Sequence, residues 1–145
     1  MPERETVDRA REDAREGKSA STQAGEFVRE EMHHIREGKH GAASTKQAIA
    51  IGLSKARRAG VKLQAKGSAS TRKKAEQDSR AFESRRKPSR TRSRARSKAL
   101  KREPRSAASR SSLSRQAKIS AESRGKSARS VAAKKAAQTR TRRAA

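Results

Sequence analysis

The stretch STKQAIAIGLSKARRAG, residues 44–60, is the clearest helix signal in the chain. Ser44 is followed three residues later by Gln47, which is the pattern of a capping box, where each side chain satisfies a free backbone N–H group. Gly60 can adopt the left-handed conformation that ends a helix, and Val61 can then fold back onto the last turn. The stretch therefore predicts an α-helix with defined ends.

One side of this predicted helix is apolar. Ile49, Leu53 and Ala56 recur at helical spacing and predict the buried stripe. Ala48 and Gly52 lie beside this stripe and are small enough to let a second helix approach closely. The same Ile49/Leu53 face would also suit a second copy of the chain, so a homo-oligomer is one expectation.

The segment before it supplies a partner helix. Residues 22–37 place Val28, Met32 and Ile35 on one stripe, and a glycine follows at position 38. We expect the two helices to pack as an antiparallel pair joined by residues 38–43.

Composition limits how large the folded part can be. The chain has 145 residues, a formal net charge of +25, 30% hydrophobic residues and 1% aromatic residues. Low hydrophobicity with high net charge is typical of disorder. The sequence has no cysteine, no apolar run of about 20 residues and no apolar segment near its N-terminus. We therefore expect a cytoplasmic protein with no membrane partner.

The charge is unevenly distributed. Residues 1–60 hold 12 Lys and Arg against 10 Asp and Glu, whereas residues 61–145 hold 28 against 5. This contrast predicts four regions: a charged N-terminal helix or arm at 1–21, a two-helix core module at 22–63, a basic helical extension at 64–87, and a Ser/Arg/Ala/Lys-rich tail at 88–145. The tail is expected to be disordered, or helical only when its charge is neutralised. The predicted fold class is mainly α: a short helical hairpin with a long basic tail.

Excess positive charge predicts a polyanionic partner. Cations every two to four residues can neutralise phosphates without contacting bases. The candidate nucleic-acid-binding residues are Lys39, His40, Lys46, Lys55, Arg57, Arg58, Lys62, Lys66, Arg72, Lys73, Lys74, Arg85, Arg86, Lys87, Arg90, Arg92, Arg94, Arg96, Lys134, Lys135, Arg140, Arg142 and Arg143.

The sequence gives a weaker indication of whether the nucleic acid is DNA or RNA. The Ser–Arg alternation at 89–97 resembles RNA-binding serine/arginine segments, but the chain has no aromatic platform on which unpaired bases could stack. Duplex DNA is therefore favoured, with an RNA- or ribosome-associated protein as the alternative. A second alternative is a protein–protein interaction module with an accessory basic tail.

Two local sites would suit DNA. Residues 45–47 occupy the first turn of a helix, where a helix-turn-helix motif presents side chains to bases, but the connection of six residues is longer than that motif uses. A phosphate held by Lys39, His40, the Ser44 hydroxyl and the free amides of the helix N-terminus is the favoured interpretation.

Three histidines lie near carboxylates. Glu30–His34 and His33–Glu37 are i, i+4 pairs, and His40 follows in the connection. Adjacent histidines point about 100° apart on a helix, so these patterns predict surface histidines beside carboxylates and no metal or other cofactor. No catalytic set is recognisable, and we expect no enzyme.

Residues 26–63, EFVREEMHHIREGKHGAASTKQAIAIGLSKARRAGVKL, resemble a family of small basic bacterial proteins of unknown function. The resemblance lies in the GKHG and KQAIAIGLSKARRAG motifs and covers about a quarter of the chain. It implies the DNA-binding or plasmid-stabilisation role for which relatives are named, with no catalytic residues. Residues 130–145 resemble histone-H1-like Ala/Lys/Arg-rich nucleoid proteins. We expect sequence-tolerant DNA binding in the nucleoid, or in genome or plasmid maintenance.

Overall fold

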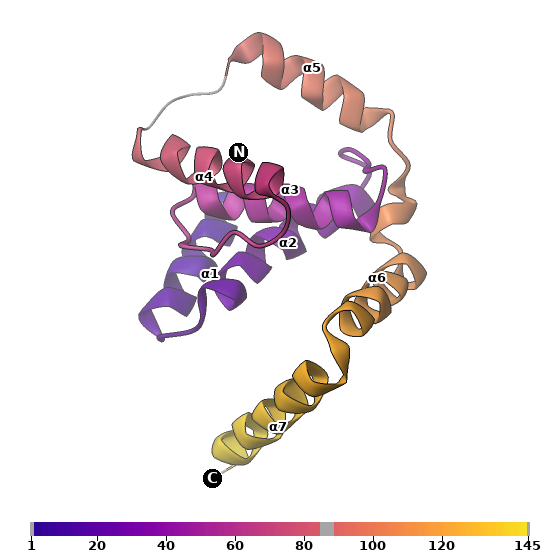
Figure 1. Cartoon of the computed structure of the whole chain (residues 1–145). Coiled ribbons are helices and arrows are strands. Elements are labelled where there is room, and N and C mark those ends of the chain that lie inside the picture. Colours follow the sequence, from indigo (N-terminus) through magenta and orange to yellow (C-terminus); the bar gives the residue numbers. More distant parts are fainter. Residues whose placement is uncertain (1, 85–88, 145) are drawn as a thin grey trace. The chain divides into compact units, whose positions relative to one another are not determined.

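A computed structural model describes residues 2–84 and 89–144, which form helices joined by turns and loops, with no strand among them (Figure 1). The elements are α1 (Arg4–Arg15), α2 (Ala20–Arg36), α3 (Thr45–Arg58), α4 (Ala69–Glu83), α5 (Arg90–Lys101), the 3₁₀ helix η1 (Arg105–Ala108), α6 (Arg110–Ser123) and α7 (Gly125–Ala144). They form two compact units, Met1–Ser109 and Arg110–Ala145. In the described ranges, no helix is both long and apolar enough to cross a membrane.

The ends of α3 are those expected from the sequence. The Ser44 hydroxyl accepts a hydrogen bond from the Gln47 N–H group (3.1 Å), and the Gln47 side chain accepts one from the Ala43 N–H group (2.7 Å). The capping box is therefore closed one residue earlier than in its usual form. At the other end, Gly60 has φ +98°, and the Val61 N–H group donates back into the last turn.

Helices α2 and α3 form the antiparallel pair, which is the most extensive contact in the protein. The buried face of α3 is made by Ala48, Gly52 and Ala56, while Ile49 and Leu53 are only half-buried. The predicted buried stripe is therefore correct for Ala56 and only partly correct for Leu53, which packs at the edge of the cluster formed by Phe27 and Ala56. Ala48 and Gly52, expected beside the stripe, are buried, and Gly52 lies against Val28 of α2, because small residues allow the two backbones to approach closely.

Gly52→Ala tests this close approach. A Cβ atom at Gly52 would lie 2.8 Å from the Val28 Cα atom, which is backbone and cannot move aside cheaply. Overpacking costs about 1–3 kcal/mol and exceeds the gain of about 0.5–1 kcal/mol in helix propensity, so we expect a net loss of stability. Denaturant unfolding checks it, with Gly25→Ala as the control, because a Cβ atom at Gly25 in α2 meets nothing within 4 Å. Equal changes in the free energy of unfolding of the two variants would contradict the close approach of Gly52 to Val28.

The apolar core extends beyond the hairpin. Phe27 and Ile35 of α2 are fully buried, and Ala10 of α1 packs with Phe27 in one cluster. The Arg9 guanidinium also pairs with the Glu26 carboxylate of α2 (2.8 Å). The charged N-terminal segment is therefore a helix that is seated on α2 by Val7, Ala10 and this ion pair, and it is not a free arm.

Helix α4 packs on the opposite side of α3 from α1. The buried Asp78 carboxylate accepts a hydrogen bond from the Ser54 hydroxyl (2.7 Å) and lies 3.5 Å from the Arg58 Nε atom. Near the end of α4, the Phe82 ring lies against Gly60, where a Cβ atom would be 2.8 Å from the ring. Gly60 thus provides both the left-handed turn and the space for this ring.

The prediction of a disordered tail is wrong. Residues 90–101, 105–108, 110–123 and 125–144 are helical. Ala, Arg and Lys are strong helix formers, and in this structure their propensity outweighs the mutual repulsion of the cations. Helices α6 and α7 contact one another within their own unit.

Part of the expected tail instead enters the core of the first unit. The Gly41 N–H group donates to the Leu100 carbonyl (2.9 Å), and the Ala42 N–H group donates to the Pro104 carbonyl (3.1 Å). A Cβ atom at Gly41 would lie 1.9 Å from the Glu103 carbonyl oxygen, so only glycine fits this crossing. Residues 100–104 are therefore held against the α2–α3 connection.

The turn η1 completes this docking. Ala107 and Ala108 are buried, and their carbonyl oxygens accept hydrogen bonds from the Thr45 hydroxyl (2.6 Å) and the Arg36 Nε atom (3.0 Å). The η1 turn thus covers the end of α2 and the start of α3.

Candidate nucleic-acid interface

Most acidic residues in the front of the chain are held in ion pairs. In the part of the chain that the structure describes, every ion pair joins residues between Glu3 and Asp78. Just after α1, for example, the Lys18 ammonium lies 2.7 Å from the Asp13 carboxylate and 2.6 Å from that of Glu16. The front of the molecule is therefore largely self-neutralised.

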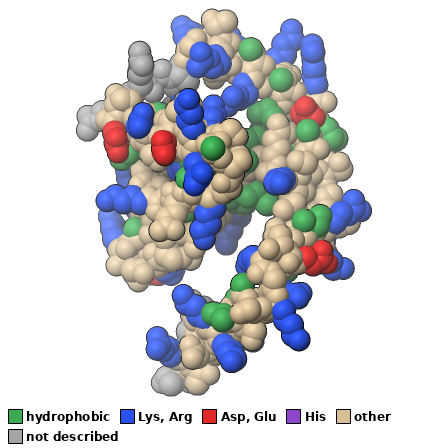
Figure 2. Space-filling model, viewed as in Figure 1, with side chains coloured by type: hydrophobic (Ala, Val, Ile, Leu, Met, Phe, Trp, Pro, Cys, Tyr) green, Lys and Arg blue, Asp and Glu red, His purple; other side chains and the backbone are tan. Residues whose placement is uncertain are grey.

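The cations that follow are exposed. Helices α5 and α7 contain six and seven Lys or Arg residues and no Asp or Glu. All of their described cationic side chains are exposed, and none forms an ion pair with another described residue. On the face drawn in Figure 2, Lys and Arg side chains project from both helices.

The cations of α7 surround the helix instead of lining one face. At about 100° per residue, Lys134 and Lys135 project about 100° apart, Arg142 projects beside Lys135, and Lys126, Arg129 and Arg140 lie on the far side of the helix. This helix therefore has no apolar stripe with which to pack on a core, and it presents positive charge on opposite sides.

The predicted interface residues divide by their surroundings. Those that are exposed and form no ion pair with a described residue are Lys46, Lys62, Lys66, Arg72, Lys73, Lys74, Arg90, Arg92, Arg94, Arg96, Lys134, Lys135, Arg140 and Arg142. Arg85, Arg86 and Lys87, and the side chain of Arg143, lie outside what the structure describes.

Four predicted residues are engaged by carboxylates. Arg58 pairs with Asp78, Lys39 with Glu3 and Glu37, and His40 with Glu31. The fourth, Lys55, belongs to the interior. Arg57, by contrast, is half-buried, and its Nε atom makes no hydrogen bond to any described residue.

The Lys55 ammonium lies between two carboxylates of α2, 3.0 Å from Glu30 Oε1 and 2.8 Å from Glu31 Oε2. Burial disfavours its charged form, but the carboxylates of Glu31 and Glu30 outweigh burial, so the pKa of Lys55 is raised. Burial likewise acts to raise the pKa of Glu30, and the hydrogen bond from Lys55 reverses that effect and lowers it. Lys55 thus compensates buried charge and is not free to meet a phosphate.

The geometry disfavours both local DNA sites expected near the start of α3. Thr45 is buried against η1 and Gln47 caps the helix, which leaves Lys46 as the exposed member of the first turn. The Ser44 hydroxyl is occupied by the Gln47 amide, and His40 faces the Glu31 carboxylate. A helix-turn-helix and a phosphate held at this N-terminus are therefore both unsupported by the contacts.

The prediction of surface histidines is correct for His33 and wrong for the other two. The His33 side chain is 66% exposed beside Glu37, but those of His34 and His40 are 13% and 17% exposed. Both are gathered around Glu31, whose side chain is fully buried. The overlooked signal is Glu31–His34, an i, i+3 pair of the Glu-x-x-His type that occurs in metal-binding helices.

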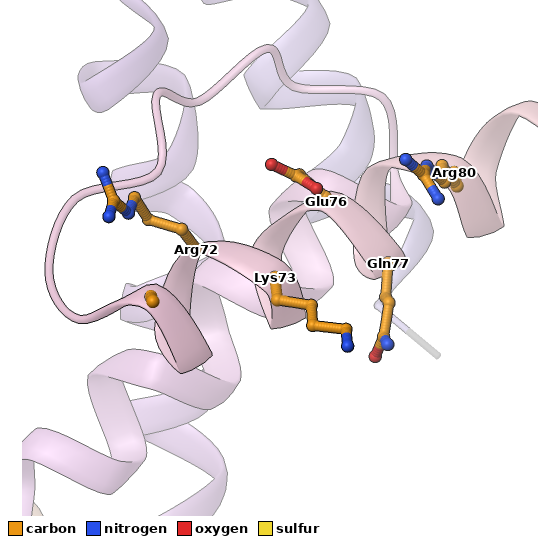
Figure 3. A pocket seen from close by; sticks show the side chains of 6 residues that line it. Arg72, Lys73, Glu76, Gln77 and Arg80 are labelled. Atoms are coloured by element: carbon orange, nitrogen blue, oxygen red, sulfur yellow. The ribbon is translucent and has the colours of Figure 1, made fainter.

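The surface hollows are open and lie along single helices. One follows the outer face of α4, where Glu76 lies between Arg72 and Arg80 and is flanked by Lys73 and Gln77 (Figure 3). A second follows α5 and is lined by Arg94, Ser97, Lys98, Lys101 and Arg102. Neither encloses a small molecule, but both present cations to solvent.

The Ile49/Leu53 face is partly used within the chain, because Leu53 packs against the apolar cluster of Phe27 and Ala56. A homo-oligomer through this face remains a prediction.

No curated protein and no solved structure matches the chain. One family model matches residues 15–67, the region that contains α2, α3 and the Glu31, His34 and His40 side chains. In these residues the chain is similar to a family of unknown function (DUF6496).

Proposed function

We propose that this chain is a non-enzymatic, sequence-tolerant DNA-binding protein that acts in the bacterial nucleoid or in genome or plasmid maintenance. The observation that carries the proposal is the separation of charge. Ten of the twelve acids between residues 3 and 78 are held in ion pairs, whereas α5 and α7 contain thirteen Lys and Arg residues without a single acid. Such a surface binds phosphates and releases their counterions.

The distribution of these cations favours sequence tolerance. Charge on opposite sides of α7 lets the helix meet a phosphate backbone in many orientations, whereas base reading requires a few side chains on one face. Duplex DNA is preferred to unpaired RNA because the chain offers no row of aromatic rings on which unpaired bases could stack. Phe27 is fully buried, and Phe82, although 51% exposed, is the single remaining aromatic residue and lies against Gly60.

Neutralising α7 tests the proposal. In the variant Lys134→Gln/Lys135→Gln/Arg140→Gln/Arg142→Gln, we expect weaker duplex binding and a shallower dependence of log K on log[salt]. The slope should fall by up to about 0.9 for each phosphate that the helix no longer neutralises. Fluorescence anisotropy with a labelled duplex at several salt concentrations measures both quantities.

The matched control exchanges the same four residues between Lys and Arg and so keeps the charge. Its salt slope should equal that of the original chain. An unchanged slope in the glutamine variant would refute the role of α7. In a competition at fixed salt, structured RNA that displaces duplex DNA at lower concentration would instead indicate the RNA-associated alternative.

A further inference from the structure

We propose that Glu31, His34 and His40 form a binding site for Zn²⁺, here called the His–Glu site. One potential ligand atom from each residue lies within 4.8 Å of the other two. Two imidazoles and a carboxylate are a ligand set that zinc uses when a water molecule completes its coordination.

The chain brings the three residues together by local geometry. Glu31 and His34 are three residues apart on α2 and therefore lie on one face. Gly38, with φ +78°, then reverses the chain, and the Lys39 N–H group donates to the His34 carbonyl (3.0 Å). This turn returns His40 to the side of the helix that carries Glu31.

The second nitrogen of each imidazole is already occupied. His40 Nδ1 lies 3.0 Å from the Gly41 carbonyl oxygen, and His34 Nε2 lies 2.8 Å from Glu3 Oε1. A carbonyl oxygen can only accept, and Glu3 Oε1 is already the acceptor of a hydrogen bond from the Lys39 ammonium (3.3 Å). Both contacted nitrogens therefore carry hydrogen. This leaves His40 Nε2 and His34 Nδ1 with lone pairs, the arrangement in which metal-binding histidines are held.

The Glu31 carboxylate is buried and incompletely satisfied. Its side chain is 0% exposed, and neither oxygen makes a hydrogen bond of good geometry to a described residue. Oε2 lies 2.8 Å from the Lys55 ammonium, while Oε1 lies 3.3 Å from His40 Nε2. With the His40 proton on Nδ1, Oε1 and Nε2 present two lone pairs to one another, and a cation between them removes the repulsion.

The surrounding charge also fits a divalent cation. Among the described residues, the carboxylates of Glu3, Glu30, Glu31 and Glu37 form ion pairs with two lysines, Lys39 and Lys55, and with the three histidines. With neutral imidazoles, these four carboxylates exceed the two ammonium groups by two negative charges. One Zn²⁺ ion balances that excess.

The fit requires only small movements. A tetrahedral zinc ion with ligands at about 2.0–2.1 Å holds them about 3.3–3.4 Å apart. Rotation about the His34 and His40 side-chain bonds can close the remaining distance, and their 13% and 17% exposure leaves access for the ion and its water. A bound zinc ion would link the end of α2 to the α2–α3 connection, against which residues 100–104 are held.

The test is calorimetric titration of the untagged, chelator-treated, nucleic-acid-free full chain with zinc chloride. We expect one ion per chain and a rise in melting temperature. Removing a group that merely supports a ligand weakens zinc sites about 10–100-fold, so His40→Gln or His34→Gln should weaken binding about 100-fold or more. His33→Gln is the matched control, because this neighbour on the same helix is exposed and lies outside the site; it should bind zinc like the original chain.

A measurement on the original chain avoids dependence on variant folding. Zinc-edge X-ray absorption of the 1:1 complex should show two imidazole ligands and one carboxylate oxygen. No zinc binding, binding abolished in His33→Gln, or an ion coordinated by oxygens alone would overturn the proposal. If a proton on His40 Nε2 instead forms a hydrogen bond to the Glu31 carboxylate and satisfies it, the chain should not bind zinc.

Discussion

Gly41→Ala is expected to destabilise the first unit by about 1–3 kcal/mol, the usual effect of overpacking a close approach. The added Cβ atom would lie 1.9 Å from the Glu103 carbonyl oxygen and 2.8 Å from that of Pro104. Both obstacles are backbone atoms, so residues 100–104 must move away. The hydrogen bond from Gly41 to Leu100 would break as they move.

Hydrogen exchange combined with thermal unfolding distinguishes this local effect from general damage. The Gly41 and Ala42 amides, which donate to the Leu100 and Pro104 carbonyls, should exchange faster, while the central amides of α2 keep their protection. Gly25→Ala again serves as the control, since its Cβ atom meets nothing. Full protection of the amides at positions 41 and 42 in the variant would contradict the docking of residues 100–104.

Lys55→Ala is expected to cost about 3–5 kcal/mol, because removing one partner of a buried ion pair leaves its counter-charge uncompensated. Here one ammonium serves two buried carboxylates, those of Glu30 and Glu31. Chemical unfolding in the presence of a chelator measures the decrease in stability without a contribution from bound metal.

The control is Lys46→Ala on the same helix, where the side chain is exposed and a change within about 0.5 kcal/mol is expected. The effect of Lys55→Ala should also shrink in a Glu30→Gln/Glu31→Gln background, because less negative charge is then left behind. Equal effects of Lys55→Ala and Lys46→Ala would show that the Lys55 ion pairs contribute little.

The parts of the fold predicted from sequence are those governed by local rules. Ser44, Gln47 and Gly60 set the ends of α3 through contacts within a few residues, and the pairing of α2 with α3 followed from their apolar positions. The buried face of α3 differs from the prediction because hydrophobicity is a poorer guide here than size. The lack of a Cβ atom at Gly52 sets how closely the helices approach, because such an atom would meet the Val28 backbone.

The parts that sequence could not predict depend on contacts between distant residues. Ala107 and Thr45 are 62 positions apart, and nothing in the composition of residues 88–145 distinguishes the short RSAA turn from the surrounding cationic sequence. The cluster of histidines around Glu31 could not be predicted from the sequence for a related reason. Its spacing to His34 is visible in the sequence, but His40 joins them only through the turn at Gly38.

The pairing of acids at the front of the chain also determines how the cationic helices can be regulated. An unpaired acidic surface would compete with DNA for α5 and α7 and hold the protein in an autoinhibited state. Here the carboxylates of Glu26, Asp13 and Asp78 already have partners close at hand. These paired acids therefore offer little internal mimic of a phosphate backbone, so under the proposed function the polyanions and salt in solution would govern the occupancy of the cationic helices.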